Sequence, residues 1–257
     1  LLSRGLGDVY KRQEGEVRAV LQLSHGMVEF IDRYKPLAEN LAARGILVTG
    51  NDHLGHGGSI RTKEDYGYFG EPDGNRAVLE DLHAVTTLTK QLYPGVPYFL
   101  LGHSMGSFLL RTYLYTYPDA VDKAVISGTG WEDPTKVRLG KLVCKLEQAR
   151  VGETSTSKLV TKLMFGSYNK PFGAVTSPNA WICSDEAVVA AYDADPLCGF
   201  DATVGLARDL LTGVEMNEQP ENLDKMNKQL PLLFVSGSKD PVGGMAKGVL
   251  RCIDAFK

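Results

Sequence analysis

One serine of this chain stands in a sequence context that is typical of a nucleophile. Ser104 is the central residue of the motif GHSMG at 102–106, which follows the apolar, strand-like run 96–101 and precedes the helix-like run 107–114. Strand, tight turn and helix form the setting in which G-x-S-x-G acts as a nucleophile elbow, holding the serine hydroxyl out at the end of a strand. The flanking glycines let the strand and the helix pass close together. A glycine-rich turn without chemistry is the alternative, and the flanking segments favour the elbow.

A serine hydroxyl reacts only when a base takes its proton, and that base needs an acid to orient it. The candidate acid is Asp240, which comes directly after the strand-like run 230–237 and should lie at the same sheet edge as Ser104. A solvated aspartate in a turn is the other interpretation of Asp240. Glu132 or Asp133, just after the preceding strand, is the alternative acid.

Backbone groups near the serine could stabilise a tetrahedral oxyanion. The run HGM at 25–27 follows the first strand-like run, and Gly26 allows its backbone to approach closely. We expect the N–H groups of Met27 and Met105 to form the oxyanion hole, in which the loss of one donor typically costs about 2.7–4 kcal/mol.

No histidine follows Asp240, and none of the five upstream histidines fits the general base. His103 lies inside the elbow, His25 lies in the oxyanion loop, and His83 is expected on a helix surface.

Asp52, His53 and His56 have a spacing that resembles a metal-ligand pattern. The glycines within 55–58 make this segment a turn whose polar groups should bond locally. We therefore expect neither a metal nor a cofactor.

Strand-like and helix-like segments alternate along the chain. The strand-like runs are 18–23, 46–52, 96–101, 122–128 and 230–237, and the helix-like runs outside the long gap before 230 are 36–45, 77–93, 107–114 and 245–256. Strands separated by helices of this length build βαβ units and a mostly parallel sheet, which binds ligands at the carboxyl ends of its strands. The expected fold class is α/β with a doubly wound sheet.

Roughly 100 residues separate the last two strand-like runs, far more than a simple crossover needs. Helix-like segments at 137–146, 159–165 and 204–211 predict an inserted helical cap that covers the strand ends and lines a pocket with apolar side chains. The predicted organisation is a first core part at 14–130, a cap at 131–229 and a second, incomplete core part at 230–257.

Composition excludes several classes of protein. The chain has 257 residues, of which 43% are hydrophobic and 23% charged, as in an ordinary globular protein. A net charge of −3 gives no basic surface for nucleic acid, and no apolar run approaches the ~20 residues of a membrane helix. The four cysteines are scattered without a C-x-x-C motif, so we expect reduced, mostly buried thiols and a cytoplasmic location.

The first residues have no helix or strand period that leads into the fold. The run DVYKRQ at 8–13 resembles the in-frame translation of a transposon-end adapter used in sequencing libraries. We therefore expect residues 1–13 to be non-native. A disordered basic N-terminus is the alternative.

Four motifs together resemble the monoacylglycerol lipase and lysophospholipase branch of the capped α/β-hydrolases, a serine aminopeptidase-like family. The motifs are HGM at 25–27, DHLGHGGS at 52–59, GHSMG at 102–106 and GSKD at 237–240, in the family's order and spacing. The resemblance covers roughly residues 17–257. It implies that Ser104 is the nucleophile, Asp240 the acid, and Met27 and Met105 the oxyanion donors.

The chain departs from this family in one respect. The resemblance implies a catalytic histidine after Asp240, with further strands before Val17 and after the last helix, and none of these occurs in the sequence. The simplest expectation is an α/β-hydrolase truncated at both ends and inactive by itself, with a pseudoenzyme as the alternative.

The expected activity is hydrolysis of lipid-type carboxylic esters, monoacylglycerols or lysophospholipids, through an acyl-enzyme on Ser104. The alternatives are a small-ester or aminopeptidase-like hydrolase and a non-catalytic binding protein on the same fold. The expected partner is a small lipid ester, with the cap as a candidate for peripheral contact with a membrane. The sequence carries no sign of an oligomeric state.

Overall fold

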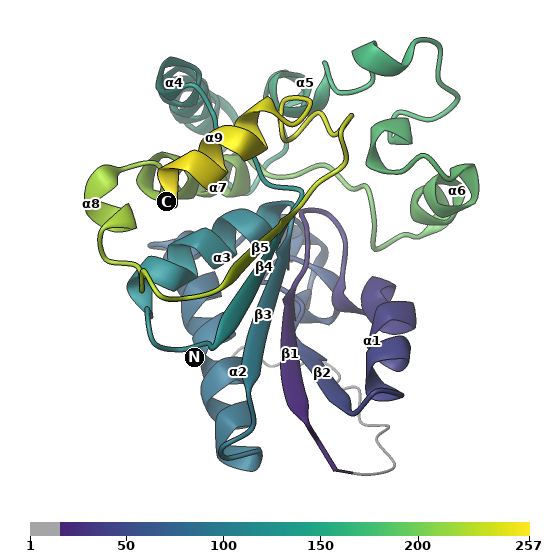
Figure 1. The fold of residues 1–257 in the computed structure, drawn as a ribbon. Helices are drawn as coiled ribbons and strands as arrows, with labels where there is room; N and C mark the ends of the chain where they lie inside the picture. Colours follow the sequence, from purple (N-terminus) through teal and green to yellow (C-terminus); the bar gives the residue numbers. More distant parts are fainter. Residues whose placement is uncertain (1–15) are drawn as a thin grey trace.

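Five parallel strands form the sheet at the centre of the computed structural model, which describes residues 16–257 (Figure 1). Their order is β2-β1-β3-β4-β5. The strands confirm the five predicted runs, whereas the expected non-native segment 1–13 lies outside the described residues. Their bounds are β1 Ala19–Ser24, β2 Ile46–Gly50, β3 Tyr98–His103, β4 Lys123–Ser127 and β5 Leu232–Val235.

The register of the strands brings the predicted site to one sheet edge. Ser24 at the end of β1 pairs with Gly102 near the end of β3, and His103 pairs with Ser127 at the end of β4. Because all four strand pairs are parallel, the segments that follow the strands emerge at the same edge.

Helices cover both faces of the sheet. On one face, Leu100 of β3 packs with Leu82 of α2 and Leu110 of α3. On the other face, Leu23 of β1 packs with Ala38 of α1. Burial on both faces explains the continuous apolar strand sequences and confirms the doubly wound α/β class. The bounds are α1 Lys35–Ala42, α2 Gly74–Leu92, α3 Met105–Thr116 and α9 Lys247–Ala255.

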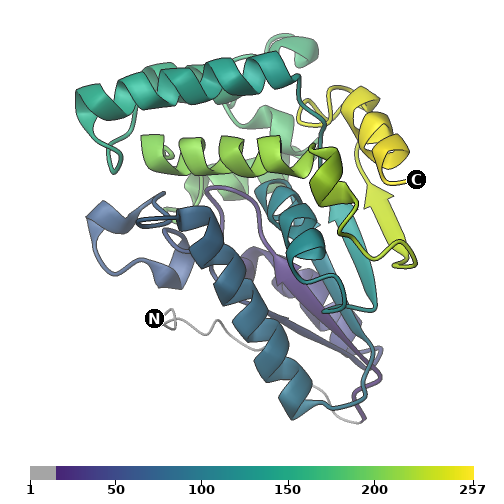
Figure 2. The same ribbon diagram turned by 90° about the vertical axis from the view of Figure 1, so that its left-hand side faces the viewer.

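The segment between β4 and β5 is helical, and Figure 1 shows its helices α4 to α7 beyond the carboxyl ends of the strands. Helix α7 packs against both α4 and the core helix α3, and Figure 2 shows α4 and α7 running alongside each other. Helices α4, α5 and α7 were predicted, whereas α6 was not. The bounds are α4 Pro134–Val151, α5 Lys158–Phe165, α6 Glu186–Ala194, α7 Val204–Asn217 and α8 Pro220–Leu223. We call residues 134–223 the cap.

No helix among residues 16–257 combines the length and the apolar character that crossing a bilayer requires. All four cysteines are unpaired, and three of them are buried, as expected from their scattered positions.

Candidate active site

Ser104 occupies the sharp turn between β3 and α3. Its backbone adopts φ 51° and ψ −120°, a strained conformation for a residue with a side chain. Both flanking glycines are needed: a Cβ at Gly102 would collide with the carbonyl of Gly106, and a Cβ at Gly106 would collide with the carbonyl of Ser24. The turn therefore has the geometry of a nucleophile elbow.

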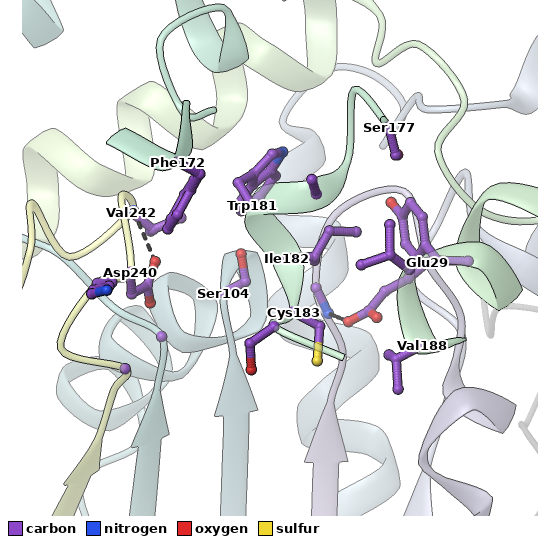
Figure 3. A pocket seen from close by; sticks show the side chains of 18 of the residues that line it. Glu29, Ser104, Phe172, Ser177, Trp181, Ile182, Cys183, Val188, Asp240 and Val242 are labelled. Carbon is purple, nitrogen blue, oxygen red and sulfur yellow. Dashed lines mark hydrogen bonds between the residues drawn. The ribbon is translucent and has the colours of Figure 1, made fainter. Parts of the chain in front are cut away.

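A cavity of about 980 Å³ opens beside Ser104, and Asp240 lies in its wall as well. Figure 3 shows both side chains directed into this space. The Asp240 carboxylate accepts hydrogen bonds from the Val242 N–H (2.9 Å) and the Ser236 hydroxyl (3.3 Å). The structure thus brings the predicted nucleophile and the predicted acid to one cavity, with the acid held in a fixed orientation.

The two alternative acids do not line this cavity. Asp133 caps the N-terminus of α4, where its carboxylate accepts the Thr135 N–H at 2.8 Å. Burial raises the pKa of Glu132, whose backbone N–H donates to Glu218. Asp240 remains the better placed of the three.

The loop after β1 passes directly against the serine. A Cβ at Gly26 would lie 3.3 Å from the Cβ of Ser104. The next residue, Met27, lines the cavity. Neither the Met27 N–H nor the Met105 N–H has an acceptor among the described residues. Two backbone donors of the residues beside Ser104 and in the adjoining loop are therefore free, and their role as the oxyanion hole stays a prediction.

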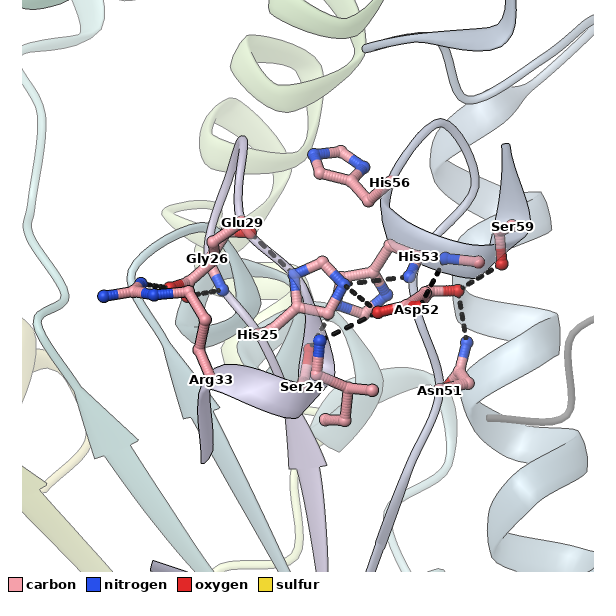
Figure 4. A network of polar contacts seen from close by, with 12 residues as sticks. Ser24, His25, Gly26, Glu29, Arg33, Asn51, Asp52, His53, His56 and Ser59 are labelled. Carbon is pink, nitrogen blue, oxygen red and sulfur yellow. Dashed lines mark hydrogen bonds and ion pairs between the residues drawn. The ribbon is translucent and has the colours of Figure 1, made fainter. Parts of the chain in front are cut away.

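The buried side chain of His25 lies beside Gly26, the residue before Met27 (Figure 4). His25 Nε2 accepts the His53 N–H at 2.9 Å, so the neutral ring carries its proton on Nδ1, which donates to the Gly26 carbonyl at 2.7 Å. In a trans peptide the C=O and the following N–H point in opposite directions. Holding the Gly26 carbonyl therefore restrains the direction of the Met27 N–H. Burial lowers the pKa of His25, which keeps the ring in the neutral form that these bonds require.

A carboxylate that no sequence motif predicted, that of Glu29, holds the other side of this loop. Glu29 is only 4% exposed and accepts hydrogen bonds from the Gly26 N–H (2.5 Å) and the Tyr34 hydroxyl (2.8 Å). Its second oxygen pairs with Arg33. Burial and the Glu29 charge raise the pKa of Tyr34, so its hydroxyl remains a donor. The spacing of Glu29 from the motifs does not predict this role.

None of the five histidines forms a hydrogen bond with Ser104 or Asp240. His53 Nε2 lies 3.1 Å from the Ser24 hydroxyl, and His56 Nδ1 lies 2.9 Å from a nearby backbone carbonyl. Burial lowers the pKa of His56 to about 3. Within residues 16–257, no three His, Cys, Asp or Glu side chains are grouped so that they could hold a metal ion.

The remaining two histidines are also engaged elsewhere. His103 lines the cavity, but its Nδ1 lies 3.2 Å from the Ser127 hydroxyl. His83 is half-buried between α2 and α3, where it stacks on Tyr117 at 3.8 Å and contacts the Tyr113 hydroxyl at 3.0 Å. His83 lies on α2 as expected, and it is half-buried because Tyr113 of α3 and Tyr117, directly after α3, cover part of its ring.

The outer wall of the cavity comes from residues 165–193, so only one of the three predicted cap segments, 159–165, contributes to it, through Phe165. Leu139, Leu142 and Leu146 of α4 are exposed, and α7 buries its apolar face against α3 and α4. For the segments 137–146 and 204–211 the prediction was wrong, because α4 and α7 pack on each other and α7 packs on the core helix α3. The apolar wall consists of Phe165, Phe172, Trp181, Ile182, Val188 and Val189.

Comparison with known proteins agrees with this fold. A family model described as serine aminopeptidase, S33, matches residues 15–252. The chain is 31% identical over 242 residues to the monoglyceride lipase of Mus musculus, covering 90% of this chain and 68% of that protein. It is 36% identical over 145 residues to a monoglyceride lipase homolog of monkeypox virus, covering 55% of this chain and about half (49%) of that protein. A thermostable carboxyl esterase from Bacillus coagulans, solved with glycerol, has a TM-score of 0.87 at 26% identity, covering 95% of this chain and 79% of that one.

The parallel sheet, the elbow and these structural neighbours define an α/β-hydrolase. Within that fold, the chain belongs to the serine aminopeptidase S33 family, whose model matches most of its length.

Proposed function

We propose that the protein is a serine hydrolase that cleaves lipid-type carboxylic esters, such as monoacylglycerols or lysophospholipids, through an acyl-enzyme on Ser104. One observation carries this proposal: a strained elbow holds Ser104 between the loop 25–28 and Asp240, in the wall of a cavity with an apolar side. A binding pocket alone would not need a strained serine at this position.

The proposed reaction has two halves. In the first, Ser104 Oγ attacks the ester carbonyl carbon, its proton passes to a general base oriented by Asp240, and the N–H groups of Met27 and Met105 stabilise the oxyanion. The carbon–oxygen bond to the alcohol then breaks, the alcohol leaves with the proton, and the acyl group remains on Ser104. In the second half, water adds to the same carbonyl, the fatty acid leaves and Ser104 regains its proton.

We infer that none of the five histidines of the chain acts as the general base. All five lie among the described residues, and none forms a hydrogen bond with the serine or the acid. The polypeptide of residues 1–257 should therefore bind an ester without hydrolysing it efficiently.

The apolar wall supports an acyl chain as the group that fills the cavity. Phe165, Phe172 and Trp181 offer large apolar surfaces, and each CH₂ buried there would contribute about 0.8 kcal/mol. Relatives named monoglyceride lipase and a structural neighbour solved with glycerol support the same substrate class.

The test is kcat/KM of the full-length gene product across p-nitrophenyl esters from acetate to decanoate. We expect kcat/KM to rise with chain length, Ser104→Ala to abolish turnover, and Val189→Asp to reduce the gain for long chains while sparing the acetate. A flat profile, or faster cleavage of aminoacyl p-nitroanilides than of medium-chain esters, would favour the aminopeptidase-like alternative. Ester binding without any Ser104-dependent turnover would favour the binding protein.

A further inference from the structure

The cap contacts the oxyanion loop at the carbonyl of Val28. The Tyr192 hydroxyl of α6 donates to this oxygen at 3.0 Å, and the Gly199 N–H donates to it at 2.9 Å. The Tyr192 ring also lies 4.8 Å beneath the guanidinium of Arg33, which pairs with Glu29. Two segments far apart in sequence, the cap and the loop after β1, are thus joined by two hydrogen bonds and a cation–π contact.

Val28 has a backbone that needs such support. Its φ is 51°, in the left-handed region that β-branched residues rarely adopt. A conformation of this kind persists only where surrounding contacts hold it in place. Both donors to the Val28 carbonyl come from the cap, so the cap supplies that support.

Met27 lies between two residues whose backbone groups are held by side chains. On one side, Glu29 binds the Gly26 N–H at 2.5 Å. On the other side, Tyr192 binds the Val28 carbonyl. The direction of the Met27 N–H therefore depends on contacts at both ends of a three-residue segment.

The Tyr192 hydroxyl stays protonated and so remains a hydrogen-bond donor. Tyr192 is 7% exposed, and burial followed by the charge of Glu29 raises its pKa. Its hydroxyl consequently keeps its proton in neutral and mildly alkaline solution.

We propose that Tyr192 is a positioning residue that makes the oxyanion hole depend on the seating of the cap, because its hydroxyl holds the strained Val28 that follows the Met27 donor. When α6 moves away from the loop, Val28 loses both donors and relaxes, and the Met27 N–H turns away from Ser104. The kinetic consequence of this inference rests on the proposed function of Ser104, whereas the coupling between cap and loop does not.

The test compares Tyr192→Phe with a matched control. Tyr192→Phe keeps the ring over Arg33 and removes one donor to Val28. The control is Tyr113→Phe, which removes the hydrogen bond from another buried tyrosine hydroxyl to Thr86 (2.9 Å) on α2, away from the loop. Tyr113→Phe also removes the contact of this hydroxyl with His83 (3.0 Å), so a general loss of stability should be at least as large in the control as in Tyr192→Phe.

The first measurement is amide hydrogen exchange, read by mass spectrometry in the peptide that covers residues 26–31. We expect exchange there to rise about five-fold in Tyr192→Phe, the factor that one net hydrogen bond is worth, and to stay at the wild-type rate in Tyr113→Phe. This measurement needs no catalytic activity.

The second measurement is the hydrolysis of p-nitrophenyl acetate by the full-length gene product. In Tyr192→Phe we expect kcat to fall about five-fold, KM to change less than two-fold, and the inhibition constant of a trifluoromethyl ketone to weaken by the same factor as kcat/KM. The ketone forms a tetrahedral adduct whose oxyanion needs the Met27 donor. Tyr113→Phe should leave kcat and the inhibition constant unchanged.

The exchange and kinetic results for the two variants together test the coupling between the cap and the loop. Amide exchange at the wild-type rate in residues 26–31 of Tyr192→Phe would overturn the inference. Equal losses of kcat in the two variants would also overturn it, because the effect would then come from stability alone. Faster exchange confined to Tyr192→Phe supports the coupling. If that result came with a wild-type protein that shows no Ser104-dependent turnover, the proposed function would fail while the coupling between cap and loop would stand.

Discussion

Replacing Gly26 by alanine tests the oxyanion loop at its tightest point. The new methyl carbon would lie 2.6 Å from Oε1 of Glu29 and 3.3 Å from the Cβ of Ser104. The first distance is too short for a carbon and an oxygen in contact, so the carboxylate or the loop must move. That carboxylate binds the Gly26 N–H at 2.5 Å. We therefore expect Gly26→Ala to break this bond and to displace the Met27 N–H from Ser104.

Two effects of different size should follow. Weakening a hydrogen bond to a charged group costs about 1.5–3 kcal/mol of folding free energy, which is less than the roughly 5–15 kcal/mol by which folded proteins are stable. The variant should therefore fold. Loss of one oxyanion donor should lower kcat by about 10²–10³, while KM changes little because this donor acts mainly in the transition state.

The assay pairs kcat for p-nitrophenyl butyrate with the urea midpoint of unfolding, both for the full-length gene product. Gly58→Ala is the matched control, because Gly58 has no left-handed backbone and its new Cβ would lie 3.4 Å from Asp52, an ordinary contact. We expect this control to keep near-wild-type kcat. A folded Gly26→Ala protein that retains more than half of the wild-type kcat would refute the reasoning.

Three further predictions concern charge, the sheet edge and the base. Burial raises the pKa of Glu218 to about 7. Between about pH 4.5 and 7 the folded state therefore holds a proton that the unfolded state has lost. The free energy of unfolding should fall as pH rises through this window. Glu218→Gln should remove that part of the pH slope in urea unfolding, and equal slopes would contradict it. The outer edge of β5 pairs with no strand among residues 16–257, and Leu233 of this strand is 57% exposed. An unpaired apolar edge favours association between chains, so Leu233→Lys should reduce the light scattering of the 257-residue polypeptide. Unchanged scattering would count against association through this edge. The same polypeptide should hydrolyse short esters about 10⁴–10⁶-fold more slowly than the full-length gene product, whereas equal rates would mean that one of its five histidines is the base.

Local signals in the sequence predicted the core. The elbow at 102–106 sits between a strand and a helix as expected, because a turn this sharp requires glycine where Gly102 meets the Gly106 carbonyl and where Gly106 meets the Ser24 carbonyl. The inner strands were predictable since burial on both faces demands continuous apolar runs, whereas β5 leaves Leu233 and Val235 exposed. Their parallel order then brings Ser104 and Asp240 to one cavity.

The cavity wall and the support of the loop could not be predicted from local patterns. Residues 166–185 contain two short 3-10 helices without a long apolar period, yet they carry Phe172 and Trp181 into the wall. Glu29 and Tyr192 act through contacts that depend on the folded arrangement of the loop and the cap. Tertiary contacts of this kind leave no mark in the spacing of residues along a chain.

The measurement that tests the central claim most directly is covalent labelling of the full-length gene product with a fluorophosphonate, followed by mass spectrometry of the digested protein. We expect one adduct, on the peptide that contains Ser104, and no labelling of Ser104→Ala under the same conditions. Equal labelling of both proteins, or an adduct on another residue, would contradict the assignment of Ser104 as the nucleophile.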